Sequence, residues 1–133
     1  MTRYLTLAEV VALHHKMMRA MGTRSQGLRD EGALESAIMR ARMAAHYEDA
    51  DIVRQAALMT VGISQAQAFV DGNKRSAYLT LDTFLAANGI DFVGEPLDLA
   101  RQLELVAERP GERDAATDAF EAWLRDRIAP RSR

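Results

Sequence analysis

The sequence predicts an all-α fold, an orthogonal bundle of about six helices. Apolar residues recur at helical spacing along most of the chain, capping and helix-ending residues separate the segments, and strand-like character is confined to Ile90–Val93. Of the 133 residues, 48% are hydrophobic, which is enough for one continuous core. We therefore expect a single domain over residues 1–128, followed by a flexible tail at 129–133.

The first two helices begin at recognisable caps. Thr6 and Glu9 form a capping box, in which the hydroxyl and the carboxylate satisfy free amide groups, and this predicts a helix over about 7–21. Asp30 caps a second helix, which should fade near Ala44. The predicted buried face of this second helix consists of Leu34, Ala37, Ile38 and Ala41.

The remaining helices follow from apolar stripes and breakers. A central helix is expected over about 51–68, because its apolar stripe is wide enough for neighbours to cover most of it. The next helix runs from about Asn73 to a stop at Asn88. Two further helices, over about 96–108 and 114–128, close the domain.

Composition excludes several classes of function. Lys and Arg total 17 against 19 Asp and Glu, and a net charge of -2 argues against direct binding of nucleic acid through bulk electrostatics. The absence of cysteine excludes disulfides and thiolate zinc sites and suits a reducing cytoplasm. The N-terminus lacks the apolar run of a signal peptide, and no segment reaches the roughly 18 apolar residues of a membrane span. We expect a soluble cytoplasmic protein without membrane contact.

The loop between the central helix and the next one holds the candidate site. Free amides at a helix start bind anions, and Gly72 lets the backbone approach a ligand closely. Lys74 and Arg75 supply a point charge and a bidentate donor for phosphate, and Asp71 supplies an oxygen ligand for Mg²⁺. On spacing alone, an ordinary turn with an N-cap and solvated charges is the favoured interpretation of the segment, because turns use the same residues.

A family resemblance favours the functional interpretation. The loop resembles the signature of the Fic and Doc families, which is His, any residue, Phe, any residue, Asp or Glu, Gly or Ala, Asn, Lys or Gly, Arg. The segments at 4–10, 27–37 and 83–89 also resemble Doc (death-on-curing) proteins, so the likeness spans nearly the whole chain. The signature residues present are Phe69, Asp71, Gly72, Asn73, Lys74 and Arg75.

The resemblance implies an activity and its participants. Such proteins transfer a phosphate-containing group from a nucleotide to a protein hydroxyl. Fic proteins that transfer AMP carry a second Arg where this chain has Tyr78, so the chain is similar to the Doc branch, which phosphorylates a threonine of elongation factor Tu. ATP and Mg²⁺ are the implied cofactors, and a Phd-like antitoxin is the implied partner, bound in a groove between helices one and two and the C-terminal pair.

The resemblance also assigns a role to each signature residue. Asp71 would hold Mg²⁺ and Asn73 a phosphate oxygen, with Gly72 at the turn. Phosphate charge would be met by Lys74 and Arg75, while Phe69 anchors the loop in the core.

One position departs from the family pattern. Gln67 stands where the family has its catalytic His, and an amide cannot take a proton from an attacking hydroxyl. Three functions stay open: an impaired phosphotransferase, a non-catalytic module that binds nucleotide or antitoxin, and an AMP transferase. The glutamine is either natural or a variant made for study. Among the three histidines, His14 is expected in the core and His15 at the surface, and His46 is the one stand-in considered for the base.

Overall fold

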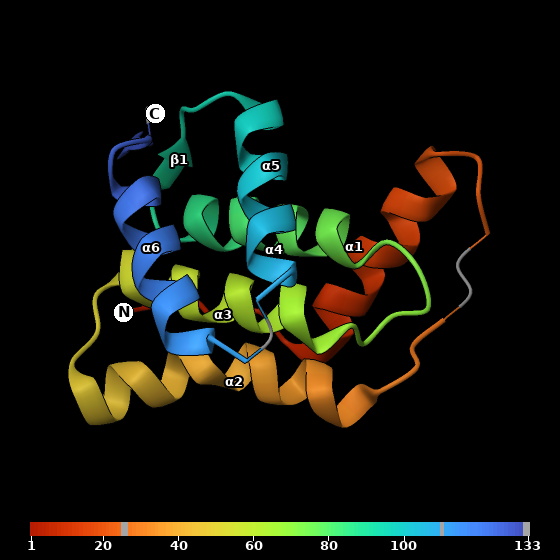
Figure 1. Cartoon of the computed structure of the whole chain (residues 1–133), viewed down its shortest axis with the longest axis horizontal. Helices are drawn as coiled ribbons and strands as arrows, with labels where there is room; N and C mark the ends of the chain where they lie inside the picture. The colour runs from red at the N-terminus through yellow and green to blue at the C-terminus, as the bar shows by residue number, and fades with distance from the viewer. Residues whose placement is uncertain (25–26, 110, 132–133) are drawn as a thin grey trace.

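The computed structural model describes residues 1–24, 27–109 and 111–131 of the chain. Within these residues it contains six α-helices and a two-stranded sheet, which confirms the expected all-α bundle (Figure 1). No helix in the described part is long and apolar enough to cross a membrane. The elements in order are α1 (Leu7–Ala20), α2 (Glu31–Glu48), α3 (Ile52–Ala66), α4 (Asn73–Ala87), β1 (Ile90–Phe92), α5 (Pro96–Ala107), α6 (Arg113–Arg125) and β2 (Ile128–Pro130).

The predicted helix starts are present as hydrogen bonds. Thr6 Oγ1 accepts from the Glu9 amide at 3.1 Å, and Glu9 Oε1 accepts from the Thr6 amide at 3.1 Å. Asp30 Oδ1 accepts from the amide of Ala33 at 3.0 Å and so caps α2. This helix is one turn longer than expected, because apolar and polar residues continue without a breaker until Asp49 adopts a left-handed conformation with φ 52°.

Helix α3 is the centre of the bundle. It packs against α2, α4, α5 and α6, and its side chains are buried on nearly all sides, as its wide apolar stripe predicts. The approach to α2 is close at Gly62, where an added Cβ would lie 3.0 Å from the Cβ of Ala37. In Figure 1 α2 runs along one side of α3, and α4 lies on the other side.

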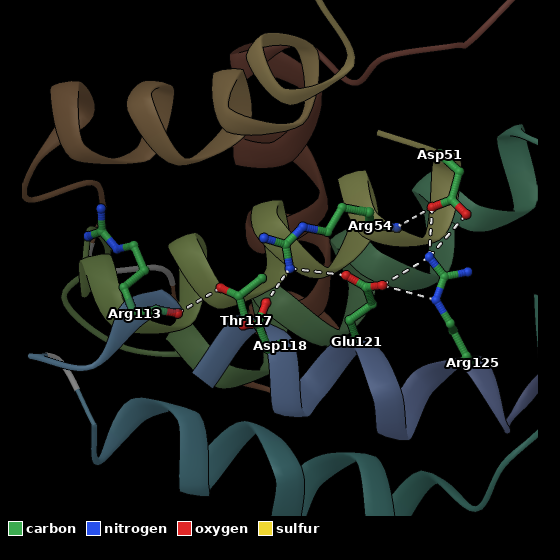
Figure 2. A network of polar contacts seen from close by, with 7 residues as sticks. All are labelled: Asp51, Arg54, Arg113, Thr117, Asp118, Glu121 and Arg125. Atoms are coloured by element: carbon green, nitrogen blue, oxygen red, sulfur yellow. Dashed lines mark hydrogen bonds and ion pairs between the residues drawn. The ribbon is translucent and has the colours of Figure 1, made fainter. Parts of the chain in front are cut away.

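A polar network joins the start of α3 to α6 (Figure 2). Asp51 caps α3 by accepting from the Arg54 amide at 2.9 Å, and its carboxylate also pairs with Arg125 Nη2 at 2.9 Å. Glu121 lies between Arg125 and Arg54 and pairs with both, at 2.9 and 3.0 Å. Two of these ion pairs cross from the start of α3 to α6, and the third joins residues one turn apart on α6. The network therefore fixes the register of α6 on α3.

The C-terminal segment differs from the expected tail. The extended piece predicted at Ile90–Val93 is β1, and it pairs antiparallel with β2, so that Asp91 lies opposite Ala129. The Arg131 amide donates to the Gly89 carbonyl at 2.9 Å. Where the sequence predicts a tail from residue 129, Ala129 and Pro130 pair with β1 and Arg131 bonds to Gly89; residues 132–133 lie outside the described part.

Candidate phosphate-binding site

The loop at 67–72, which joins α3 to α4, is fixed to the segment that precedes α2. An isolated antiparallel bridge pairs Leu28 with Phe69. The Ala68 carbonyl accepts from the amides of Arg29 and Asp30, at 2.6 and 3.0 Å. The segment before α2, about 40 residues from the loop in sequence, thus holds the loop in place through backbone hydrogen bonds.

The base of the loop is an aromatic stack. Phe69 is fully buried, at 0% exposure, and its ring stacks on that of His14 with 3.7 Å between centroids. His14 comes from α1 and is also at 0% exposure, as expected for a core histidine, and its Nε2 lies 2.7 Å from the Asp71 carbonyl oxygen. Burial lowers the pKa of His14 from its ordinary value, so the ring is neutral at pH 7.

The Asn73 side chain forms hydrogen bonds with the backbone of the loop. Its Oδ1 accepts from the Phe69 amide at 2.9 Å, and its Nδ2 donates to the Phe69 carbonyl at 2.9 Å. Both ends of the carboxamide are therefore engaged inside the loop. A phosphate role for Asn73 stays a prediction, and in this geometry its backbone amide at the helix start is the group available for it.

Gly72 makes the turn into α4. Its φ is 79°, in the left-handed region that favours glycine, and it caps the helix without a side chain. An added Cβ would lie 3.0 Å from Met18 Sδ and 3.2 Å from His14 Nε2, so α1 leaves no room for a side chain. The Gly72 amide donates to Asp71 Oδ1 at 2.8 Å. The turn is therefore tightly packed, and the first amides of α4 have no side-chain cap and no partner within the helix.

The predicted polar site residues meet at one hollow of about 290 Å³. Arg75 is exposed and makes no ion pair with any residue the structure describes, although its Nη1 lies 2.7 Å from Met21 Sδ. Lys74 is paired with Glu104 of α5 at 3.2 Å. The hollow is lined by Gln67, Val70, Asp71, Gly72, Asn73, Lys74, Arg75 and Ala107.

The carboxylate of Asp71 is compatible with Mg²⁺. It is exposed at the hollow, and among contacts with described residues only its Oδ1 is engaged, by the Gly72 amide. The described part of the chain contains no group of three or more potential metal-ligating side chains. A cation here would depend on Asp71 together with phosphate oxygens and water, which is how Mg²⁺ is commonly held with nucleotides.

Gln67 ends α3 and does not continue it. It adopts φ 50° and ψ 41°, its Nε2 donates to the Ser64 carbonyl at 2.8 Å, and its own carbonyl accepts from Arg29. The side chain is exposed at the hollow. Histidine is among the residues that tolerate a left-handed conformation, so the backbone at this position suits the family's residue as well.

His46 is too distant to replace the missing base. It lies exposed in the last turn of α2, whereas the loop is fixed to residues that precede the first turn of that helix. At a rise of about 1.5 Å per residue, the 15 steps from Glu31 to His46 span roughly 22 Å. We therefore discard His46 as a base.

A second hollow, of about 450 Å³, adjoins the first and shares Lys74 and Arg75 with it. Its other walls are mostly apolar and come from α1, α4 and α5. The groove expected between helices one and two and the C-terminal pair stays a prediction; this hollow lies between α1, α4 and α5. The other lining residues are Met17, Tyr78, Leu79, Ala100, Leu103 and Glu104.

Sequence reasoning missed the contributions of α1 and α5 to the site. The contact of His14 with the loop and the pairing of Glu104 with Lys74 join residues 57 and 30 positions apart. Only the position of His14 on the apolar stripe of its helix signalled that it would point inward.

Comparison with known proteins gives the same family as the loop signature. A sequence model of the Fic/DOC family matches residues 4–85. The chain is 32% identical to "Toxin Doc" of Mycolicibacterium smegmatis over 99 residues, which are 73% of this chain and 75% of that protein. It is 30% identical to "Protein kinase doc" of Escherichia phage P1 over 95 residues, 71% of this chain and 75% of that protein. The chain belongs to the Fic/Doc family.

Proposed function

We propose that this chain is a Doc-type toxin that transfers the γ-phosphate of ATP to a protein hydroxyl, with a threonine of elongation factor Tu as the acceptor. The observation that carries the proposal is the hollow at the start of α4, which combines free helix amides, two cations and one carboxylate. A kinase name among the relatives supports phosphate transfer over AMP transfer. Tyr78 in place of a second Arg supports it as well.

Each side chain has a distinct task in this proposal. Asp71 holds Mg²⁺, which supplies charge neutralisation to the phosphates when bound. Arg75 is available for a bidentate phosphate contact without breaking an ion pair with any described residue. Lys74 must exchange Glu104 for phosphate, at little cost because the pair is exposed on both sides.

The missing base limits the chemistry rather than the binding. In the transfer, the acceptor oxygen bonds to the γ-phosphorus, the bond from phosphorus to the bridging oxygen breaks, and ADP leaves. The hydroxyl proton needs an acceptor, and the Gln67 amide has no accessible pKa. Loss of a general base costs about 10²- to 10⁴-fold in rate, so we expect slow transfer and intact nucleotide binding.

The test compares the chain with its Gln67→His and Gln67→Asn variants. Asn is the matched control, because it tolerates the left-handed conformation but cannot accept a proton. Each protein is incubated with elongation factor Tu and ATP labelled at the γ or the α phosphate. We expect His to raise γ-label transfer at least about tenfold, Asn to leave it unchanged, and ATP affinity to stay within about threefold.

The other outcomes separate the alternatives. Transfer of the α label would assign the chain to AMP transfer. If all three proteins transfer label equally and calorimetry shows ATP binding, the chain would be a non-catalytic module that binds nucleotide. Gln67 in the position of the base favours this alternative. Absence of ATP binding with Mg²⁺ would reject the nucleotide site.

A Phd-like antitoxin is the proposed partner, since toxins of this kind are silenced by a small protein encoded beside them. The hollow between α1, α4 and α5 suits an apolar helix face, and it adjoins the phosphate loop, so its occupant would also cover Arg75. A peptide from the cognate antitoxin should raise the melting temperature. No shift at saturating peptide would contradict this pairing. The acceptor places the proposed activity in the cytoplasm.

A further inference from the structure

One fully buried titratable side chain has no task in the proposed chemistry. His14 lies in the third turn of α1, at 0% exposure. It contacts the loop in two ways, through the face of its ring and through a ring nitrogen. Its flat face stacks on Phe69, with 10° between the ring planes. Its Nε2 meets the Asp71 carbonyl at 2.7 Å.

The second contact fixes which nitrogen carries the proton. A carbonyl oxygen only accepts, so Nε2 must be the donor. At 0% exposure the ring lies buried under the loop and outside the lining of the hollow, so it cannot reach an acceptor hydroxyl there as the base that Gln67 cannot supply.

The Asp71 carbonyl lies at the point where the loop turns toward the anion site. It belongs to the peptide whose amide is that of Gly72, the residue with φ 79° that precedes α4 as its N-cap. The same peptide links the Mg²⁺ carboxylate of the proposal to the helix amides that face the phosphate. The orientation of this one peptide group therefore decides whether carboxylate and amides point to the same ligand.

We propose that His14 is a positioning residue for anion binding: its ring rests on Phe69, and the hydrogen bond from its Nε2 to the Asp71 carbonyl holds the peptide of Asp71 and Gly72 in the orientation that presents Asp71 and the α4 amides to a polyphosphate. His14 itself does not touch the ligand. The identification of that polyphosphate as ATP rests on the proposed function. The requirement for His14 extends to any polyphosphate bound at this helix start.

Two substitutions separate the donor from the ring. His14→Gln keeps an N–H donor at the same number of bonds from Cα but removes the stacked ring. His14→Phe keeps a flat ring against Phe69 but leaves the Asp71 carbonyl without its donor. Val10→Ala is the matched control, because Val10 lies one turn earlier on α1, is equally buried, and forms no hydrogen bond with the loop.

The measurements are the melting temperature and the dissociation constants for pyrophosphate and for ATP with Mg²⁺. We expect His14→Phe to weaken both ligands at least about tenfold, and His14→Gln by less than about threefold. Val10→Ala should lower the melting temperature while leaving both affinities unchanged. In the unsubstituted chain, nitrogen NMR of the imidazole should show the proton on Nε2, with a shift that changes when pyrophosphate binds.

The outcomes distinguish this inference from the proposed function. Binding of pyrophosphate but not of ATP would reject the nucleotide while retaining the role of His14. Equal weakening by Val10→Ala and both His14 variants, in proportion to melting temperature, would reduce His14 to a packing residue and overturn the inference. If His14→Phe does not fold, His14→Gln alone decides, since affinity lost in a folded donor-retaining variant contradicts a role for the N–H. Failure of the unsubstituted chain to bind either ligand would overturn both proposals.

Discussion

At the residue scale, Arg75 carries a positive charge that forms no ion pair with any described residue. Its guanidinium is exposed and contacts the sulfur of Met21, whereas Lys74 is paired with Glu104. Such an arrangement leaves the protein with a cation whose removal should cost binding and almost no stability.

Arg75→Ala should therefore weaken binding of ATP with Mg²⁺ about tenfold, because a charge-assisted contact to phosphate is lost. The melting temperature should stay within about 2 °C. Arg101→Ala is the matched control, since Arg101 is exposed on α5 outside both hollows. Calorimetry that gave the same affinity for both variants would contradict the anion site.

His14 also makes stability depend on pH. Burial lowers its pKa in the folded state below the ordinary value of 6.5, so the unfolded chain binds the proton first as the pH falls. The stability contribution of His14 is thus complete above about pH 6.5 and declines below it, until the lowered pKa of the folded state is reached. Urea unfolding between pH 5 and 8 should show this decline, and His14→Gln should reduce its slope. An unchanged slope would mean that other groups cause it.

The signature residues could be placed from the sequence because they are contiguous, and neighbours on one tight loop must share one site. Their individual contacts could not be placed in this way. The carboxamide of Asn73 turns inward to the Phe69 backbone, and this choice depends on how Phe69 is held by α1 and by the segment before α2. Gln67 likewise leaves the helix at a point that periodicity alone does not mark.

At the scale of elements, the α3 to α6 contact rests on Asp51, which caps one helix and pairs with Arg125 on the other (Figure 2). Hydrogen bonding with Arg125 is the main cause that lowers the pKa of this carboxyl group. The side chain is 58% exposed, so the ion pair alone contributes little.

Asp51→Ser keeps the cap and loses the pair, whereas Asp51→Ala loses both. We expect Ala to reduce the free energy of unfolding by about 1 to 2 kcal/mol and Ser by less than about 0.5 kcal/mol. Chemical denaturation of the two variants provides the measurement. Equal losses would show that the ion pair, and not the cap, carries the contact.

Removal of β2 should loosen the end of α6. A chain ending at Arg127 would expose Phe92 of β1, which lies 5.9 Å from the ring of Trp123, and would lose the half-buried Ile128. We expect a loss of about 1 to 3 kcal/mol in unfolding free energy. Because the chain has one tryptophan, its fluorescence spectrum reports on this contact directly. An unchanged spectrum and stability would mean that the strand pair is dispensable.

Helix starts were predictable and some ends were not. Starts such as Thr6 and Asp30 carry their partners within three residues, so they are visible locally. The end of α6 and the existence of β2 depend on β1, whose residues pair across about 40 positions of sequence. Distant pairing of this kind leaves no periodic signal in a three-residue strand.

At the scale of the whole molecule, the bundle provides a firm base for one irregular loop. The central α3 is covered on nearly all sides, and the loop follows it directly, so the position of the site is fixed by the most buried helix. The fold class followed from hydrophobic periodicity across the chain, because each helix buries one stripe. The second hollow could not be predicted, since it depends on which helices α1 packs against.

The bridge between Leu28 and Phe69 has a consequence for hydrogen exchange. The amides of Asp30 and Val70 are bonded to carbonyls of the opposite segment, at 3.0 and 3.2 Å, although neither residue belongs to a helix. Exchange at both therefore requires the two segments to separate, so they should open together as one cooperative unit. Their deuterium uptake should slow in parallel when a polyphosphate occupies the loop, which would make the backbone before α2 a remote reporter of ligand binding.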